Sequence, residues 1–325
     1  MRNWMRVTAF GLFALAIVSP ARAAAEPAGQ SRAEPDRLTP SDAEAIVHMN
    51  VRQMLKAALV KKHAFEPLQT LLQRNDELRQ ILRAAGLNPL KDIDTIELST
   101  SGNPLEGGKM LTVVRGDFSP EKARAAAEEY AKKHPERLKI VKVGQTTVWE
   151  IPSDPKSFYA SFAGNKALVL TAKKEDTAAA VARADQTPPQ SNSSMRATLD
   201  HLEGSETMWM AMVVTDDIKQ LLKSDDTTKE FGSTMRSITG ALKLSDDAHF
   251  SLVVHADSPK AAEKIKDKIQ EMMQLLTFLG AGKDANGRLV KEIIGSIKLN
   301  ADKNDARLTL EITEAQIEKA GKKSP

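Results

Sequence analysis

LTVVRGDFSPEKARAAAEEY, at residues 111–130, is repeated in outline by SLVVHADSPKAAEKIKDKI at residues 251–269. Each stretch has an apolar segment typical of a strand, a short acidic turn, the dipeptide Ser-Pro and an amphipathic helix. Ser followed by Pro is favoured where a helix begins, so the hydroxyls of Ser119 and Ser258 are both predicted to cap a helix. The repeat predicts an α+β fold of two repeated domains, each with a mostly antiparallel sheet and with helices packed mainly on one face.

The pattern extends outward from these two stretches in the same order. Besides the two repeated stretches, period-two alternation and apolar runs predict further strands at 45–51, 95–99, 138–143, 147–151, 158–162, 167–171, 207–214, 241–245, 297–300 and 307–312. Helical spacing predicts helices at 120–133, 175–184, 216–223, 259–279, 289–294 and 314–320, and a further helix through Phe231, Met235 and Ile238 that ends at Gly240. The run at 45–51 also fits a short buried helix, but its repeat partner at 207–214 favours a strand.

Composition shifts divide the chain into six parts. Residues 1–23 are predicted to be a signal peptide, 24–43 a disordered leader, 44–186 the first α+β domain, 187–204 a linker, 205–320 the second α+β domain and 321–325 a tail. The leader is small, polar and rich in proline, and the linker begins with TPPQSNSS, which cannot continue a helix or a central strand.

The N-terminus carries an export signal. Two arginines precede the apolar run VTAFGLFALAIV at 7–18, and Ala21-Arg22-Ala23 has the spacing that signal peptidase cleaves. This run is shorter than the roughly 20 apolar residues that span a membrane. We therefore expect an extracytoplasmic (periplasmic or secreted) protein that starts at Ala24 or Glu26 and has no transmembrane segment after signal cleavage.

The charge balance argues against nucleic acid as a partner. The leader peptide holds three of the 46 basic residues and no acid, so the mature chain has as many basic residues as its 43 acidic ones. A neutral chain lacks the positive surface that binds phosphate backbones. The chain also has no cysteine, which excludes disulfides, thiolate metal sites and cysteine nucleophiles.

Several segments together resemble a known group of proteins. They are VRQML, LVKKH, AAGLNPLKDIDTIELS, VVRGDF followed by SPEK, and MWMAMVVTDDIK, within 45–320. In this order they resemble a group of uncharacterised secreted hypothetical proteins of planctomycete-type bacteria. The resemblance implies export and a duplicated α+β architecture, and it supplies no catalytic residue.

No motif predicts a catalytic, cofactor or metal site. Ser119-Pro120-Glu121-Lys122 fits the S-x-x-K pattern of penicillin-recognising enzymes, but the repeat copy lacks the lysine and the companion motifs are missing from the sequence. His249 and His255 are predicted to share the solvated face of one strand, too far apart for one metal ion. The acidic pairs at 216–217, 225–226 and 246–247 lack a calcium-loop pattern and fit helix starts and turns.

The helix at 259–279 carries the candidate surface. Its C-terminal part is apolar nearly all round, which indicates burial on more than one side or an exposed binding surface. The residues of this possible surface for a hydrophobic ligand or partner protein are Ile269, Met272, Met273, Leu276 and Leu279.

Taken together, these features favour a secreted, non-enzymatic protein that acts by binding or as a structural component of the cell envelope. Its partner is an unknown protein or a hydrophobic small molecule. One alternative is an extracytoplasmic carrier of a hydrophobic ligand, which an apolar pocket would favour. The other is a hydrolase with dispersed catalytic residues, which polar side chains converging in a cleft would favour.

Overall fold

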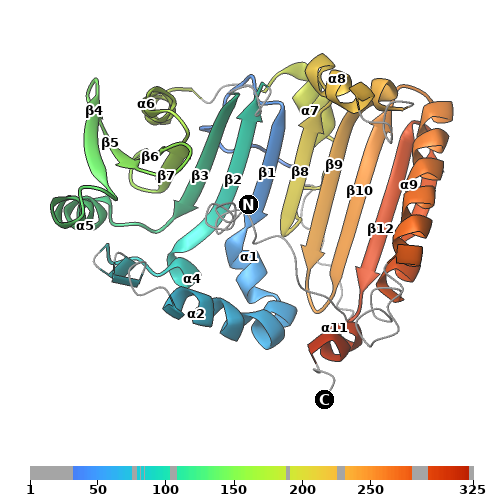
Figure 1. Ribbon diagram of the computed structural model, residues 1–325, viewed down its shortest axis with the longest axis horizontal. Helices are drawn as coiled ribbons and strands as arrows, with labels where there is room; N and C mark the ends of the chain where they lie inside the picture. The colour runs from blue at the N-terminus through green and yellow to red at the C-terminus, as the bar shows by residue number, and fades with distance from the viewer. Residues whose placement is uncertain are drawn as a thin grey trace.

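The computed structural model describes residues 32–74, 79–80, 82–83, 85–102, 108–187, 191–224, 231–279 and 292–321. Within these residues, twelve strands form one sheet in which every pairing is antiparallel (Figure 1). The strands are β1 (Ala45–Asn50), β2 (Ile93–Ser101), β3 (Lys109–Gly116), β4 (Lys139–Val143), β5 (Thr146–Ile151), β6 (Phe158–Phe162), β7 (Ala167–Thr171), β8 (Met208–Val213), β9 (Met235–Leu244), β10 (Ala248–Ala256), β11 (Lys298–Asp302) and β12 (Asp305–Ile312). The mixed, antiparallel class is as predicted. The two halves, however, share one continuous sheet where a separate sheet was predicted for each.

The two halves of the chain meet at the pair β1 and β8. These strands run antiparallel, with Ala45 opposite Met212 and Met49 opposite Met208. From this seam the strand order is β1-β2-β3-β7-β6 on one side and β8-β9-β10-β12-β11 on the other. The first side continues into β5 and β4, which form the far edge.

Helices connect the strands and close the ends of the sheet. After β1 the chain forms α1 (Val51–Lys56), the π-helix η1 (Val60–Ala64) and α2 (Phe65–Arg74) in near succession. The other described helices are α4 (Pro89–Asp92), α5 (Pro120–Lys133), α6 (Lys174–Ala182), η3 (Arg183–Asp185), α7 (Ser193–Leu199), α8 (Asp216–Ser224), η4 (Gly232–Thr234), α9 (Pro259–Leu279) and α11 (Glu314–Gly321). No described helix is long and apolar enough to cross a membrane.

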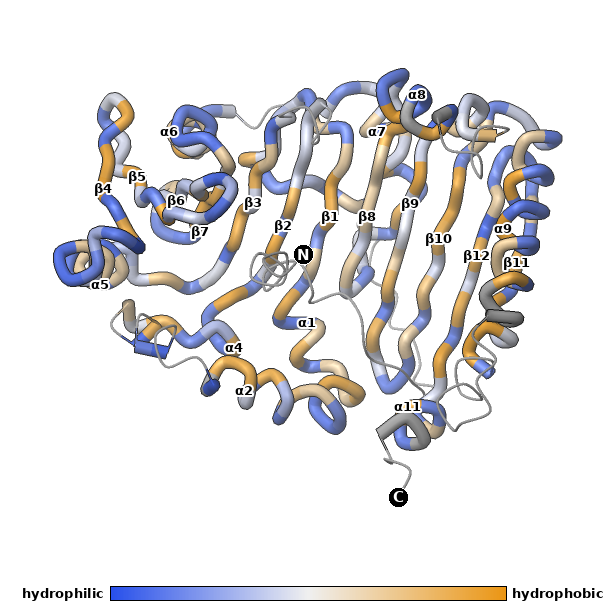
Figure 2. The backbone as a smooth tube through the Cα atoms, in the orientation of Figure 1, coloured by the Kyte–Doolittle hydropathy of each residue, from blue (hydrophilic) through white to orange (hydrophobic). Residues whose placement is uncertain are grey.

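Helices pack on both faces of the sheet, although they were predicted to pack mainly on one face. On one side, which we call the α7 face, α7 packs through Met195 and Leu199 against Trp209 and Ala211. On the other, the α9 face, Ile265 of α9 belongs to the cluster that contains Val254 and Ala306. The reason is in the strands: β8 is apolar at every position (MWMAMV), so both of its faces need cover. Figure 2 shows this apolar character continuing along the neighbouring strands.

The leader and the linker are more ordered than expected. A disordered leader was predicted over residues 24–43, but Leu38 is only 1% exposed and Ala43 only 2% exposed, so residues 32–43 pack on the α7 face. The predicted linker over 187–204 contains α7, whose Met195 is fully buried. Both segments are held by distant side chains, which local composition does not reveal. The predicted signal peptide, residues 24–31 and nearly all of the predicted tail lie outside the described residues.

One predicted helix is a strand. The segment through Met235 and Ile238 was predicted to be helical up to Gly240, but residues Met235–Leu244 form β9. Gly240 has a packing role there, because a Cβ atom at this position would lie 2.7 Å from the Cγ of Met210 on β8. The glycine therefore permits the close approach of two strands and does not end a helix.

Candidate functional site

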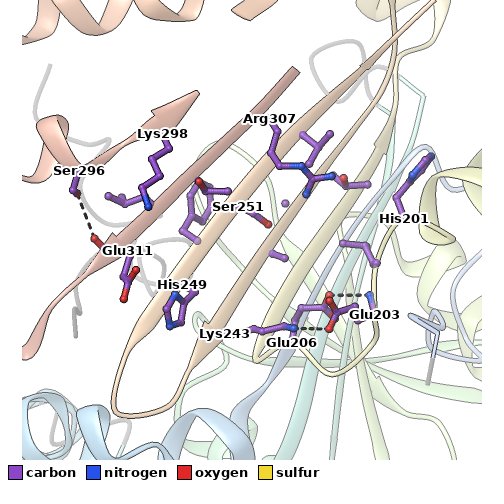
Figure 3. Close-up of a pocket in the computed structure, with 18 of the residues that line it drawn as sticks. His201, Glu203, Glu206, Lys243, His249, Ser251, Ser296, Lys298, Arg307 and Glu311 are labelled. Carbon is purple, nitrogen blue, oxygen red and sulfur yellow. Dashed lines mark hydrogen bonds and ion pairs between the residues drawn. The ribbon is translucent and has the colours of Figure 1, made fainter. Parts of the chain in front are cut away.

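A groove lined by both polar and apolar residues lies on the α7 face, over β9, β10, β12 and β11. Its volume is about 740 Å³. The turn after α7, which carries His201 and Glu203, forms one wall, and Ser296 and Lys298 form the other (Figure 3). Successive side chains of a strand point to opposite faces of the sheet, so alternate residues of these four strands form the floor of the groove. Among these residues, Lys243 lies opposite His249, which lies opposite Glu311.

The wall beside α7 contains a buried carboxylate with spare hydrogen-bonding capacity. Glu206 is 4% exposed, and its Oε1 accepts a hydrogen bond of 2.9 Å from the backbone N–H of Glu203. Its Oε2 has no hydrogen-bond partner among the described residues. Glu203 itself pairs with Lys243 at 2.5 Å, and this bond lowers the pKa of Glu203 below its usual value. A buried, half-satisfied carboxylate is costly, and a donor group on a ligand would satisfy it if the Glu206 side chain turned its Oε2 toward the groove.

Two cations face the groove from the strands nearest the edge. Arg307 of β12 and Lys298 of β11 are both exposed, and neither forms an ion pair within the part of the chain that the structure describes. Arg307 lies opposite Asn300 and Lys298 opposite Thr309, so all four side chains are on the α7 face. The groove therefore combines a buried carboxylate with two cations that form no ion pair with any described residue.

A buried histidine network adjoins the groove. His255 of β10 lies with Nδ1 2.8 Å from Oδ1 of Asp305 and with Nε2 3.0 Å from the hydroxyl of Thr239. The ring of His201 stacks on that of His255, with centroids 4.0 Å apart. Burial is the main cause that lowers the pKa of His255, and it outweighs the opposite effect of Asp305.

This network corrects the prediction for the histidines. His249 and His255 do share one face, and His249 is exposed as predicted. His255 is not solvated, because only 6% of it is exposed. Its partners His201 and Asp305 come from other segments, and no motif connects them in the sequence.

Asp305, His255 and Thr239 have the spacing of an orienting acid, a base and a nucleophile. Two features argue against acyl transfer at Thr239. The residue is 2% exposed, and β9 pairs with both β8 and β10, so its backbone N–H groups are engaged in the sheet. Backbone donors for an oxyanion are therefore lacking around Thr239 in the described strands.

A second buried polar cluster lies at the centre of the sheet. Glu97 of β2 is 2% exposed and accepts hydrogen bonds from the backbone N–H of Asp36 and the hydroxyl of Thr39. Nδ1 of His48 is 3.0 Å from its Oε2, and the ring of His48 stacks on Trp209. Because residues 36–39 close over this cluster, its role is to hold the N-terminal segment on the sheet.

The surface predicted on α9 is split by the structure. Ile269 packs against the cluster around Ile265, and Met273 is partly buried. Met272 is 45% exposed, and its neighbour Leu275 is 58% exposed. The side chains of Leu276 and Leu279 lie outside the described part of the structure. Among the described side chains of this surface, Ile269, Met272 and Met273 do not line the groove, since α9 packs on the opposite face.

Ser119 occupies the N-cap position of α5, but its hydroxyl makes no capping hydrogen bond. The two serines therefore differ, because the Ser258 hydroxyl accepts from the backbone N–H of Ala261 at 3.3 Å. Asp216 and Asp217 lie in the first turn of α8, where a carboxylate is stabilised by the helix dipole.

No protein-family profile, curated protein or solved structure matches the chain.

Proposed function

We propose that the chain is a secreted, non-enzymatic protein that acts by binding, and that its ligand site is the groove on the α7 face. The proposed ligand is a small zwitterionic molecule with a carboxylate or phosphate at one end and an amine at the other. One observation carries this proposal: Arg307 and Lys298 lack ion pairs in the described residues, while the buried Glu206 lacks a donor for Oε2.

The chemistry of the ligand follows from these groups. A guanidinium and an ammonium on neighbouring strands favour an oxyanion. The unpaired oxygen of Glu206 favours an ammonium or another hydrogen-bond donor. The charged side chains of the groove support a ligand with charged ends, and the buried Thr239 hydroxyl gives little support to the hydrolase hypothesis.

We further propose that the fold consists of two repeated α+β units that share one sheet. The strand orders β1-β2-β3-β7-β6 and β8-β9-β10-β12-β11 support this view, as does the antiparallel pair at the seam. The helices α5 and α9 follow β3 and β10 in the same way, and each begins at a Ser-Pro dipeptide. The hairpin of β4 and β5 is then an insertion in the first unit, and the groove belongs to the second.

Export rests on the sequence alone. The basic start, the apolar run at 7–18 and the Ala-Arg-Ala site support an extracytoplasmic location.

The groove is tested by native mass spectrometry of protein recovered from the extracytoplasmic fraction of its own host cells. We expect wild-type protein to retain a small polar molecule that Arg307→Ala and Glu206→Gln lose. Arg124→Ala is the matched control, because Arg124 is an exposed arginine on α5, away from the groove. The proposal is wrong if all four proteins carry the same molecules or none, and a lipid bound to wild type would favour the carrier hypothesis instead.

A further inference from the structure

His201, His255 and Asp305 form a cluster of potential metal ligands. The proposed binding of a zwitterionic ligand in the groove does not depend on these three residues. One potential ligand atom from each of the three side chains lies within 4.8 Å of those of the other two. The three residues come from the turn after α7, from β10 and from β12. We propose that these three side chains bind a zinc ion.

The ligand atoms are close enough for a tetrahedral ion, but the ring of His201 must first turn out of its stack on His255, because a histidine binds a metal ion in the plane of its ring. Zinc lies about 2.0–2.2 Å from nitrogen and oxygen ligands, which places its ligand atoms about 3.3 Å apart. Nδ1 of His255 and Oδ1 of Asp305 are 2.8 Å apart, so an ion that replaces the shared proton separates them by about half an ångström. His201 is exposed, so its side chain has room to complete the site.

Thr239 orients the central ligand. When Nδ1 of His255 binds the ion, Nε2 carries the proton and donates it to the Thr239 hydroxyl at 3.0 Å. A histidine that binds a metal commonly donates its second ring N–H to a fixed acceptor, which sets the tautomer and the ring orientation. Thr239 is 2% exposed in the middle of β9, so this acceptor is held in place.

The ligand set favours zinc over the hard cations. Two imidazoles and one carboxylate suit zinc, whereas calcium and magnesium prefer oxygen ligands. Three protein ligands leave a fourth position open, as in zinc sites that bind a further molecule. His201 also lines the groove, so the proposed ion would lie beside it.

Arg307 distinguishes this site from the groove proposed above. It lies two residues from Asp305 on the same strand and the same face. A fixed cation opposes a bound metal ion. Arg307→Ala is therefore expected to leave zinc affinity unchanged or tighter, although the same change is expected to abolish binding of the zwitterionic ligand.

The test uses metal-stripped protein and zinc alone, titrated by calorimetry and by competition with a chromophoric chelator. We expect one zinc ion per chain with a dissociation constant in the micromolar range or below. His201→Asn and Asp305→Asn should each weaken binding at least tenfold, and Thr239→Val about tenfold as a loss of orientation. His249→Asn is the matched control, because His249 is an exposed histidine of the same strand that belongs to a different cluster.

Circular dichroism of the zinc-free variants checks that each one is folded. His201 is exposed, so His201→Asn is expected to fold and can test the site even if a variant at a buried position does not fold. X-ray absorption of the loaded protein should show two imidazoles in the zinc shell. The proposal is overturned by a dissociation constant near millimolar, or by equal affinity of His201→Asn and wild type. A loss confined to His249→Asn would also overturn it, because the ion would then lie at Asp247, His249 and Glu311.

Discussion

At the scale of single residues, the buried carboxylate of Glu97 binds the N-terminal segment to the centre of the sheet. It lies in the middle of the sheet and accepts hydrogen bonds from a segment that precedes it by 61 residues. Asp36 of that segment also pairs with Arg115 of β3, so the carboxylate and the guanidinium together hold the N-terminal segment against the sheet.

Glu97→Gln tests this role. The substitution keeps the size of the side chain, but its amide NH₂ would face the donors that now point at a carboxylate. We expect a loss of about 2–3 kcal/mol in the free energy of unfolding, since a buried hydrogen bond to a charged group is removed and a donor is left unpaired. Urea unfolding measures it. Glu128→Gln on the exposed side of α5 is the control and should change stability little. A loss no greater than that of the control would show that the N-terminal segment is held by packing alone.

At the scale of helices and strands, the two Ser-Pro helix starts look alike in sequence but differ in structure. The hydroxyl of Ser258 accepts the backbone N–H of Ala261, whereas the hydroxyl of Ser119 accepts no such bond. The equal capping predicted from the repeat is therefore wrong for Ser119.

This difference predicts unequal costs for the two alanine substitutions. Ser258→Ala should destabilise the protein by about 1 kcal/mol, and Ser258→Asp should restore most of the loss because Asp is also a good N-cap. Ser119→Ala should cost clearly less, since no capping bond is lost. Thermal unfolding of the three variants beside wild type decides it. Equal losses at both serines would mean that Ser119 does cap its helix in solution.

At the scale of the whole molecule, the continuous sheet makes the two halves one cooperative unit. The seam between β1 and β8 is paired along five residue positions, and Ile46 of β1 belongs to the same core cluster as Trp209 and Met195. Neither half can unfold without exposing this shared core.

Two tryptophans on opposite sides of the seam report on this cooperativity. Trp149 lies on β5 and Trp209 on β8. In variants that keep only one of them, with every other tryptophan replaced by phenylalanine, we expect the same urea midpoint from fluorescence and from circular dichroism. Both midpoints are measured on the same variant, by fluorescence and by far-ultraviolet circular dichroism, so a loss of stability caused by the replacement shifts both midpoints equally. Two separate midpoints would show that the halves unfold independently.

Local patterns in the sequence predicted the positions of most strands and of the helices α5 and α9. Eleven of the twelve strands lie where alternation or an apolar run predicted them, and α5 and α9 keep their predicted bounds, because local periodicity reports which side of an element is buried. β9 was largely missed, since its apolar spacing fits a helix equally well and the contact between Gly240 and Met210 is not local. The ordered segment at 32–43 was missed because its stabilising partners, Glu97 and Arg115, are distant in the chain.

The residues of the candidate site could be recognised as neighbours only from the tertiary structure. The apolar pattern of 259–279 drew attention to α9, whereas the groove lies on the opposite face and takes its side chains from several separate segments of the chain. His201, His255 and Asp305 meet because α7 packs across the sheet and β10 pairs with β12. Local sequence reports burial and turn chemistry within a few residues. The convergence of distant side chains depends on strand order and register, and here both were fixed by one shared sheet that composition and spacing did not predict.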